Sequence, residues 1–248
     1  MTISIGQIRI PVIATILVLI GLGILLNLGF WQVGRADEKR QLLEEIDNRK
    51  TMNPVTLEYL DNQRDKGFYH LKLDGEFLPD NYVLLDNRIV KGQAGFEVIQ
   101  PYRVGHRTIL INRGWIPLPQ DRTVLPNVPL ETGYIKVTGI VYEPTRAIVL
   151  REDQLDASTA WPKLVQSLDM EKLTALYDQL GLTIEPWILR QDPDDESFFK
   201  REWLYVNMTP ERHISYAVTW FGLAFALVII YIAALLKIKE KNLGERRK

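Results

Sequence analysis

The sequence predicts an α+β membrane protein in which two transmembrane helices, one N-terminal and one C-terminal, flank a mainly antiparallel β domain with one or two helices. Three observations predict this class. An apolar run near each end has the length of a bilayer-spanning helix. The residues between the runs carry several strand-like segments and turn signals. Basic residues far outnumber acidic ones outside that middle segment.

The first apolar run covers residues 10–30 and is interrupted only by Pro11, Thr15, Asn27 and three glycines. A cleaved signal peptide is the alternative to a membrane anchor. Its apolar core would be shorter, and a small-x-small cleavage site would follow it. This run instead continues directly into Trp31 and Gln32. We therefore predict an uncleaved transmembrane helix at residues 10–30, after a short N-terminal segment, residues 1–9.

The second predicted span covers residues 213–236. Thr209 can cap a helix there and Pro210 suits its first position. Six Lys or Arg residues lie in the last 12 residues, 237–248, which predicts a cytoplasmic tail by the positive-inside rule. With two spans the N-terminus is then cytoplasmic too, and the domain at residues 31–212 lies outside the cytoplasm. No arginine-rich transit segment precedes the first span, which favours a bacterial inner-membrane protein with a periplasmic domain.

The composition of the middle segment narrows the function classes. Residues 36–212 carry 22 basic and 29 acidic groups, a net charge of −7, which argues against a nucleic-acid partner. The chain has no cysteine, which excludes disulfides, thiolate metal sites and cysteine nucleophiles.

The middle segment alternates strand and turn signals. A helix is expected to continue from the first span over residues 33–49. Strands are expected at residues 68–77, 82–88, 95–102, 108–112, 134–142, 187–190 and 203–208, with a hairpin turn at 104–107 and an extended loop at 116–133. A second helix begins after Asp169, which can cap it between the staple residues Leu168 and Leu173, and Gly181 can end it. An antiparallel barrel or a sandwich fits these elements.

Common catalytic motifs are missing from the sequence: it contains no phosphate-binding glycine loop, no zinc-protease histidine pair and no Gly-x-Ser-x-Gly elbow. His70 fits a packing or solvent role in a strand, and His106 fits an exposed hairpin tip. An acidic run at residues 192–196 could attract a cation, although such runs are more often solvated loops.

The domain-side ends of the two spans hold the most informative residues. His213, Tyr216 and Trp220 share one helix face by their i, i+3, i+7 spacing, and Asn27, Trp31 and Arg35 share another. If the spans pack together, an imidazole, three aromatic rings and a guanidinium gather at one depth. The alternative is an ordinary interfacial belt of aromatic rings with an anchoring arginine. His213 lies near a helix N-terminus, which disfavours its charged form, and a neutral imidazole can ligate a metal or haem iron. A capping or surface role for His213 stays open.

Ordered matches along nearly the whole chain resemble the Surfeit locus protein family, whose yeast member is called Shy. They are Leu28-Gly29-Phe30-Trp31-Gln32, Leu85-Asp86-Asn87-Arg88, Asn112-Arg113-Gly114-Trp115-Ile116-Pro117 and His213-Ile214-Ser215-Tyr216-Ala217-Val218-Thr219-Trp220-Phe221. One departure is Thr219, where the family usually carries Gln, so this chain lacks that amide and any hydrogen bond that it makes.

The resemblance implies a non-enzymatic assembly factor for haem–copper cytochrome oxidase. Bacterial members of the family are thought to receive haem a and help place it in oxidase subunit I. The implied partners are therefore subunit I, the haem a synthesis machinery and the membrane, and the implied haem-linked residue is His213, as ligand to the haem iron. We assign the ring contacts to Tyr216, Trp220 and Trp31, and a propionate contact to Arg35.

Five residues of the domain motifs, Asn87, Arg88, Asn112, Arg113 and Trp115, are expected at strand ends. Turn formation and core packing is the favoured interpretation, and a partner-docking surface is the rival. Three other functions remain as alternatives to the haem chaperone. They are a scaffold for an oxidase assembly intermediate without haem, a membrane-anchored sensor, for which the tail leaves little room, and an anchored hydrolase, for which no motif is found.

Overall fold

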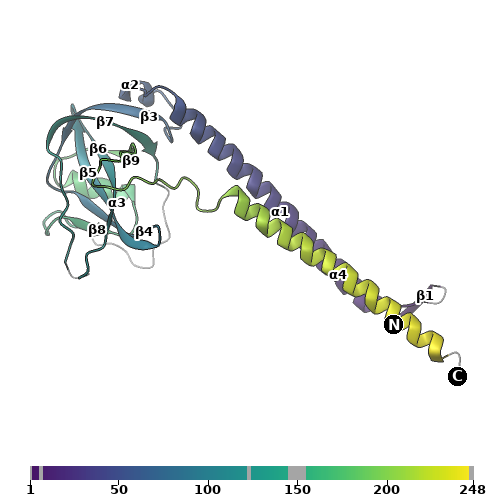
Figure 1. Cartoon of the computed structure of the whole chain (residues 1–248). Coiled ribbons are helices and arrows are strands. Elements are labelled where there is room, and N and C mark those ends of the chain that lie inside the picture. Colours follow the sequence, from purple (N-terminus) through teal and green to yellow (C-terminus); the bar gives the residue numbers. More distant parts are fainter. Residues whose placement is uncertain (1, 6–7, 122–123, 145–154, 246–248) are drawn as a thin grey trace. The chain divides into compact units, whose positions relative to one another are not determined.

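The computed structural model describes residues 2–5, 8–121, 124–144 and 155–245 (Figure 1). Its helices are α1 (Val12–Thr51), α2 (Leu57–Asp61), α3 (Met170–Asp178) and α4 (Pro210–Glu245). Its strands are β1 (Thr2–Ile5), β2 (Ile8–Pro11), β3 (His70–Phe77), β4 (Val83–Val90), β5 (Gln93–Val104), β6 (Arg107–Pro117), β7 (Gly133–Tyr142), β8 (Lys163–Val165) and β9 (Ile184–Gln191). The chain forms two compact units, residues 1–45 with 205–248, and residues 46–204. Three basic residues of the predicted tail, Arg246, Arg247 and Lys248, lie outside the described residues.

The first unit contains two long helices, α1 and α4, that lie side by side and antiparallel (Figure 1). Both are long and apolar enough to cross a bilayer. In the most apolar 18-residue stretch of each helix, only 6% is buried inside the protein. A hydroxyl contact joins Thr15 to Tyr231, and a hydrogen bond joins Gln32 to His213. Gln32 follows Thr15 by almost five helical turns, roughly 25 Å, which is close to the hydrocarbon thickness of a membrane. The two polar contacts therefore lie near the two ends of the apolar segment of the helix pair.

Small residues line the contact between these helices. Gly29 of α1 is buried against the ring of Phe221, and Ala217 and Ala224 of α4 are 2% and 3% exposed. Small side chains let helix backbones approach closely where lipid offers no hydrophobic driving force for association. His213 lies on the same face of α4, four residues before Ala217.

The second unit is a small β-barrel. Strands β3, β7, β9, β6 and β5 are hydrogen-bonded in that order, and a short β3–β5 pairing at Phe77 and Tyr102 closes the ring. All neighbours in the ring are antiparallel except β6 and β9. Strands β4 and β8 extend the sheet beyond β5, with β8 parallel to β4.

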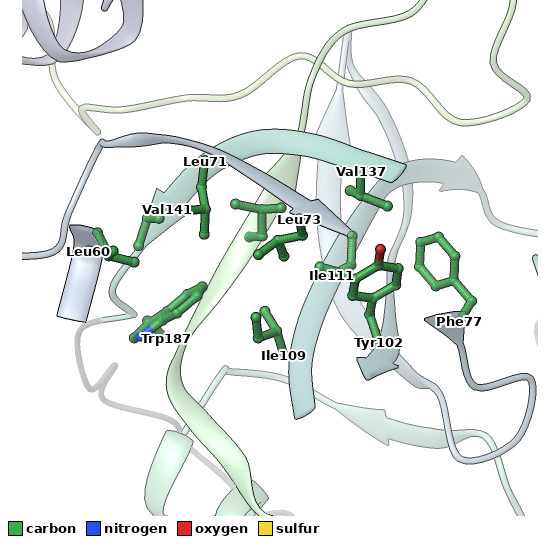
Figure 2. Close-up of a cluster of buried hydrophobic side chains, with 11 residues drawn as sticks. Leu60, Leu71, Leu73, Phe77, Tyr102, Ile109, Ile111, Val137, Val141 and Trp187 are labelled. Carbon is green, nitrogen blue, oxygen red and sulfur yellow. The ribbon is translucent and has the colours of Figure 1, made fainter. Parts of the chain in front are cut away.

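Alternate residues of the five barrel strands fill its interior (Figure 2). They are Leu71, Leu73 and Phe77 of β3, Tyr102 of β5, Ile109 and Ile111 of β6, Val137 and Val141 of β7, and Trp187 and Leu189 of β9, with Leu60 of α2 at one end. Each is at most 2% exposed. These side chains make the barrel interior a packed core.

Helix α3 covers an outer face of the sheet. Asp169 accepts a hydrogen bond from the Lys172 backbone N–H and so caps the helix, and Leu168 and Leu173 are both buried beside it. The buried face of α3 packs on residues of β4, β5, β6 and β9. A further cluster on the β4–β5–β6 extension is covered by Val128 and Phe199.

Most elements expected from the sequence are confirmed, with ends that differ by a few residues. The helix at 33–49 continues the first span as one helix, the hairpin turn at Gly105 has φ +61°, and α3 begins after Asp169. The expected strand at 203–208 is wrong, because those residues form no regular element and Trp203 instead donates to the Gln191 carbonyl of β9. The strands β1, β2 and β8 and the helix α2 were not expected.

Candidate functional site

Of the residues predicted at the domain-side ends of the two spans, His213 is the most buried. It lies in the first turn of α4 and is 8% exposed. Its Nδ1 is 2.7 Å from Oε1 of Gln32. An amide oxygen can only accept a hydrogen bond, so this contact places the imidazole proton on Nδ1. The lone pair of a neutral imidazole then lies on Nε2.

The second ring nitrogen of His213 remains available. Among the described residues Nε2 has no hydrogen-bond partner, and it is not fully enclosed. A neutral imidazole with one nitrogen held and the other open is the form in which histidine ligates metals. His213 therefore has the chemistry of a potential ligand, held in place by the neighbouring helix.

Trp31 and Arg35 lie on another face of α1. Trp31 is 53% exposed, and the Arg35 guanidinium is 5.8 Å from the centre of its ring. Arg35 also forms an exposed ion pair with Glu38 at 2.5 Å. The structure thus brings Trp31 and Arg35 together, but it places neither in direct contact with His213.

Tyr216 and Trp220 lie one and two turns further along α4. Tyr216 is 50% exposed, and Trp220 is half-buried. Tyr216 lines an open depression of about 400 Å³, together with Met208, Arg212, Ser215 and Thr219. The hydroxyls of Ser215 and Thr219 donate to carbonyls of their own helix. The depression therefore presents an aromatic ring and a guanidinium from the first turns of α4, and His213 is not among its lining residues. Thr219 lines its wall at the position where the resemblance leads one to expect Gln.

Gln32 is the residue that the sequence reasoning missed. The interval from Gly29 to Gln32 to Ala36 is three and then four residues, which places all three on one helix face. Gly29 contacts Phe221, Gln32 contacts His213, and Ala36 is fully buried. A polar residue within a stripe of small residues is the signal that identifies Gln32.

The comparison with known families decides the assignment. The model of the SURF1 family matches residues 19–225, which is most of the chain. The chain belongs to the SURF1 family.

The similarity to individual SURF1-like proteins extends along most of the chain. A SURF1-like protein of Rickettsia felis is 26% identical over 88% of this chain and 94% of its own length. A SURF1-like protein of Rickettsia bellii is 26% identical over 92% of this chain and 93% of its own length. One of Dictyostelium discoideum is 25% identical over 86% of this chain and 93% of its own length. Membership of the SURF1 family implies a general role in oxidase assembly at a membrane, in accord with the two apolar helices.

The SURF1-like motif Asn112-Arg113-Gly114-Trp115 lies inside β6, at a β-bulge opposite Val98 and Ile99, and not at a strand end as expected. Asn112 donates to Glu97 at 2.6 Å and accepts from the Gly114 N–H at 3.1 Å. Gly114 has φ +122° there, and an added Cβ would lie 2.8 Å from a backbone oxygen.

The two Asn-Arg motifs of the domain are linked to each other. The indole of Trp115 donates to the Arg88 carbonyl at 3.0 Å, and Asn87 sits at the register shift of β4 with φ +60°. Asn112, Arg113 and Trp115 are at most 2% exposed, whereas Asn87 is exposed and Arg88 half-buried. Burial of three of the five residues favours the structural interpretation over a docking surface.

Arg113 is the most buried cation of the domain among the residues the structure describes. It donates to Gln100, to the Pro129 carbonyl and to Glu131, and its guanidinium is 4.4 Å from the centre of the Phe199 ring. Burial lowers the pKa of Arg113, and the nearby Glu131 carboxylate opposes that shift. The contacts of Arg113 therefore fasten the loop after β6 to the barrel.

The remaining predicted groups lie apart. His70 is 2.8 Å from Asp192, which ties the start of β3 to the segment after β9. His106 is exposed at the hairpin tip, as expected. The described residues contain no cluster of three or more His, Cys, Asp or Glu side chains that could hold a metal ion.

Proposed function

We propose that this SURF1 family member is an assembly factor for haem–copper cytochrome oxidase that carries haem a on His213 at the membrane surface. The observation that supports the proposal is the state of His213. Its Nδ1 is held by Gln32, and its Nε2 has no hydrogen-bond partner among the described residues. Tyr216, three residues further along α4, lines an open depression. Haem iron accepts a neutral imidazole nitrogen as an axial ligand.

The surroundings of His213 suit a flat, amphipathic cargo. Tyr216 and the half-buried Trp220 offer ring faces, and the apolar faces of α1 and α4 continue from this level into the span. Arg212 lines the depression with Tyr216, so a propionate contact suits Arg212 as well as the sequence-predicted Arg35. A single histidine ligand gives a bond that can be released, which delivery to oxidase subunit I requires.

The proposed orientation follows from charge. The domain lies on the periplasmic side of the inner membrane and both termini lie in the cytoplasm, because the basic residues gather after α4. In this orientation His213, at the start of α4, lies at the periplasmic surface of the inner membrane.

Absorption spectra of the full chain test the haem proposal. The chain is purified in detergent from cells that make haem a, as wild type and as His213→Ala and His106→Ala variants. We expect a haem band in wild type and in His106→Ala, and its loss in His213→Ala. A chain that is free of haem under haem-replete conditions contradicts the proposal.

One observation favours a second function. The Gln32–His213 hydrogen bond also joins the two spans, so His213 could serve packing alone in a scaffold that stabilises an assembly intermediate. Under that function, cells that carry the His213→Asn variant still assemble the oxidase, provided that the asparagine keeps the two helices together. Under the haem function His213→Asn fails, because the amide does not replace the axial ligand.

A further inference from the structure

We infer that Gln32 is the positioning residue for His213: it fixes the ring tautomer that leaves Nε2 free and limits how strongly that nitrogen binds iron. This inference rests on the proposed haem function for its second part only. The first part concerns the protein without haem.

The tautomer argument follows from the donor and acceptor roles. A neutral histidine in water carries its proton on either nitrogen, and only the Nδ1–H form presents a lone pair at Nε2. Gln32 places an amide oxygen 2.7 Å from Nδ1. His213 is 8% exposed, so little water competes for this nitrogen. The amide therefore selects the form that can ligate through Nε2.

The packing of the helices holds the amide in place. Gln32 follows Gly29 by one turn, and Gly29 is pressed against Phe221, so the backbone of α1 is close to α4 here. Ala217 follows His213 by one turn on the same buried face of α4. Close backbones on both sides restrict the two side chains to geometries that keep their hydrogen bond.

The strength argument follows from the chemistry of the acceptor. Ligating histidines usually donate their second N–H to a carboxylate, a carbonyl or water, and a stronger acceptor makes the ligand more basic. The amide of Gln32 is neutral and is a weaker acceptor than a carboxylate. The Gln32 amide therefore orients the imidazole and raises the basicity of Nε2 less than a carboxylate would. A bond of intermediate strength suits a carrier that must also release its cargo.

Two substitutions and one control separate these effects. Gln32→Leu removes the acceptor, and Gln32→Glu keeps an acceptor and strengthens it. Asn27→Leu is the matched control, because Asn27 is a side-chain amide of α1 five residues before Gln32 and is exposed. Wild type and variants are compared as full chains in detergent.

The first measurement is ¹⁵N NMR of the haem-free chain labelled at histidine, assigned with His70→Ala, His106→Ala and His213→Ala variants. We expect the Nδ1–H form of His213 in wild type, Gln32→Glu and Asn27→Leu, and a shift to the Nε2–H form or a mixture in Gln32→Leu. The Nε2–H form in wild type overturns the inference, as does an unchanged tautomer in Gln32→Leu.

The second measurement uses haem-loaded chains. We expect the iron–histidine stretching frequency in resonance Raman spectra to rise in the order Leu, Gln, Glu at position 32, with about 10- to 100-fold weaker haem binding in Gln32→Leu. Transfer of haem to apomyoglobin should be slowest from Gln32→Glu. Equal frequencies in all variants overturn the strength argument. Failure of every variant to bind haem refutes the proposed function instead, and the NMR result then decides the tautomer by itself.

Discussion

Gly29 and Phe221 are in such close contact that a Cβ atom added to Gly29 would clash with the phenylalanine ring. The ring also packs edge-on against Phe30, at 5.2 Å between centroids. This contact lies one turn along α1, and about two turns along α4, from the Gln32–His213 hydrogen bond. The same helix contact therefore supports both the packing of the spans and the position of the proposed ligand.

Gly29→Ala should therefore weaken the helix pair. We expect a loss of about 1–3 kcal/mol, typical of overpacking a tight contact, seen as a lower midpoint of thermal unfolding in detergent. Gly23→Ala is the matched control, because a Cβ at Gly23 meets nothing within 4 Å. Equal midpoints for the two variants would show that the helices do not pack at Gly29.

Arg113→Met should destabilise the domain by about 1–3 kcal/mol, because Gln100 and the Pro129 carbonyl lose a charged donor. Chemical denaturation of the full chain measures this change. Arg103→Met is the control, since the Arg103–Glu76 pair is exposed and contributes little. A smaller effect at Arg113 than at Arg103 would contradict the anchoring role.

Tyr102 gives a prediction for alkaline pH. Burial raises the pKa of its hydroxyl to about 12, above the value of about 10 for an unfolded tyrosine. The folded state therefore binds this proton more tightly, and its contribution to stability is present below pH 10 and is lost as the pH rises towards 12.

Tyr102→Phe also removes a hydrogen bond to the Ile135 carbonyl, which should cost about 1 kcal/mol at neutral pH. Between pH 10 and 12, however, the free energy of unfolding should fall less steeply in Tyr102→Phe than in wild type. Parallel curves for the two proteins over that range would rule out the raised pKa.

The proposed orientation can be tested by labelling, because the chain has no native cysteine. In intact cells, a membrane-impermeant maleimide should modify His106→Cys, at the exposed hairpin tip, and should leave Asn242→Cys unmodified until the cells are opened. The reverse pattern would place the domain in the cytoplasm.

Local patterns predicted helices α1, α3 and α4 and most strands, because apolar runs, caps and alternating residues act over a few neighbours. Asp169 and Gly105 are examples in which one residue marks a cap or a turn. The closed barrel was one of two options from the sequence. The β3–β5 closure and the parallel β6–β9 pairing join distant segments, and no local pattern encodes them.

The site was predicted in part for a similar reason. His213 was predicted from its position at a helix start and from the family resemblance. The sequence did not determine which face of α1 turns towards α4. The prediction used the face of α1 that carries Trp31, whereas Gly29 and Gln32 lie on the face that contacts α4. Which face packs depends on the partner helix, and the small-residue stripe is its sequence signal.

The central claim is that Nε2 of His213 binds the haem iron. Its most direct test is the iron–histidine stretching band in resonance Raman spectra of the haem-loaded full chain, with ¹⁴N- and ¹⁵N-labelled histidine. We expect a band that shifts on labelling, disappears in His213→Gly and returns when imidazole is added to that variant. A band that persists unchanged in His213→Gly would contradict the account.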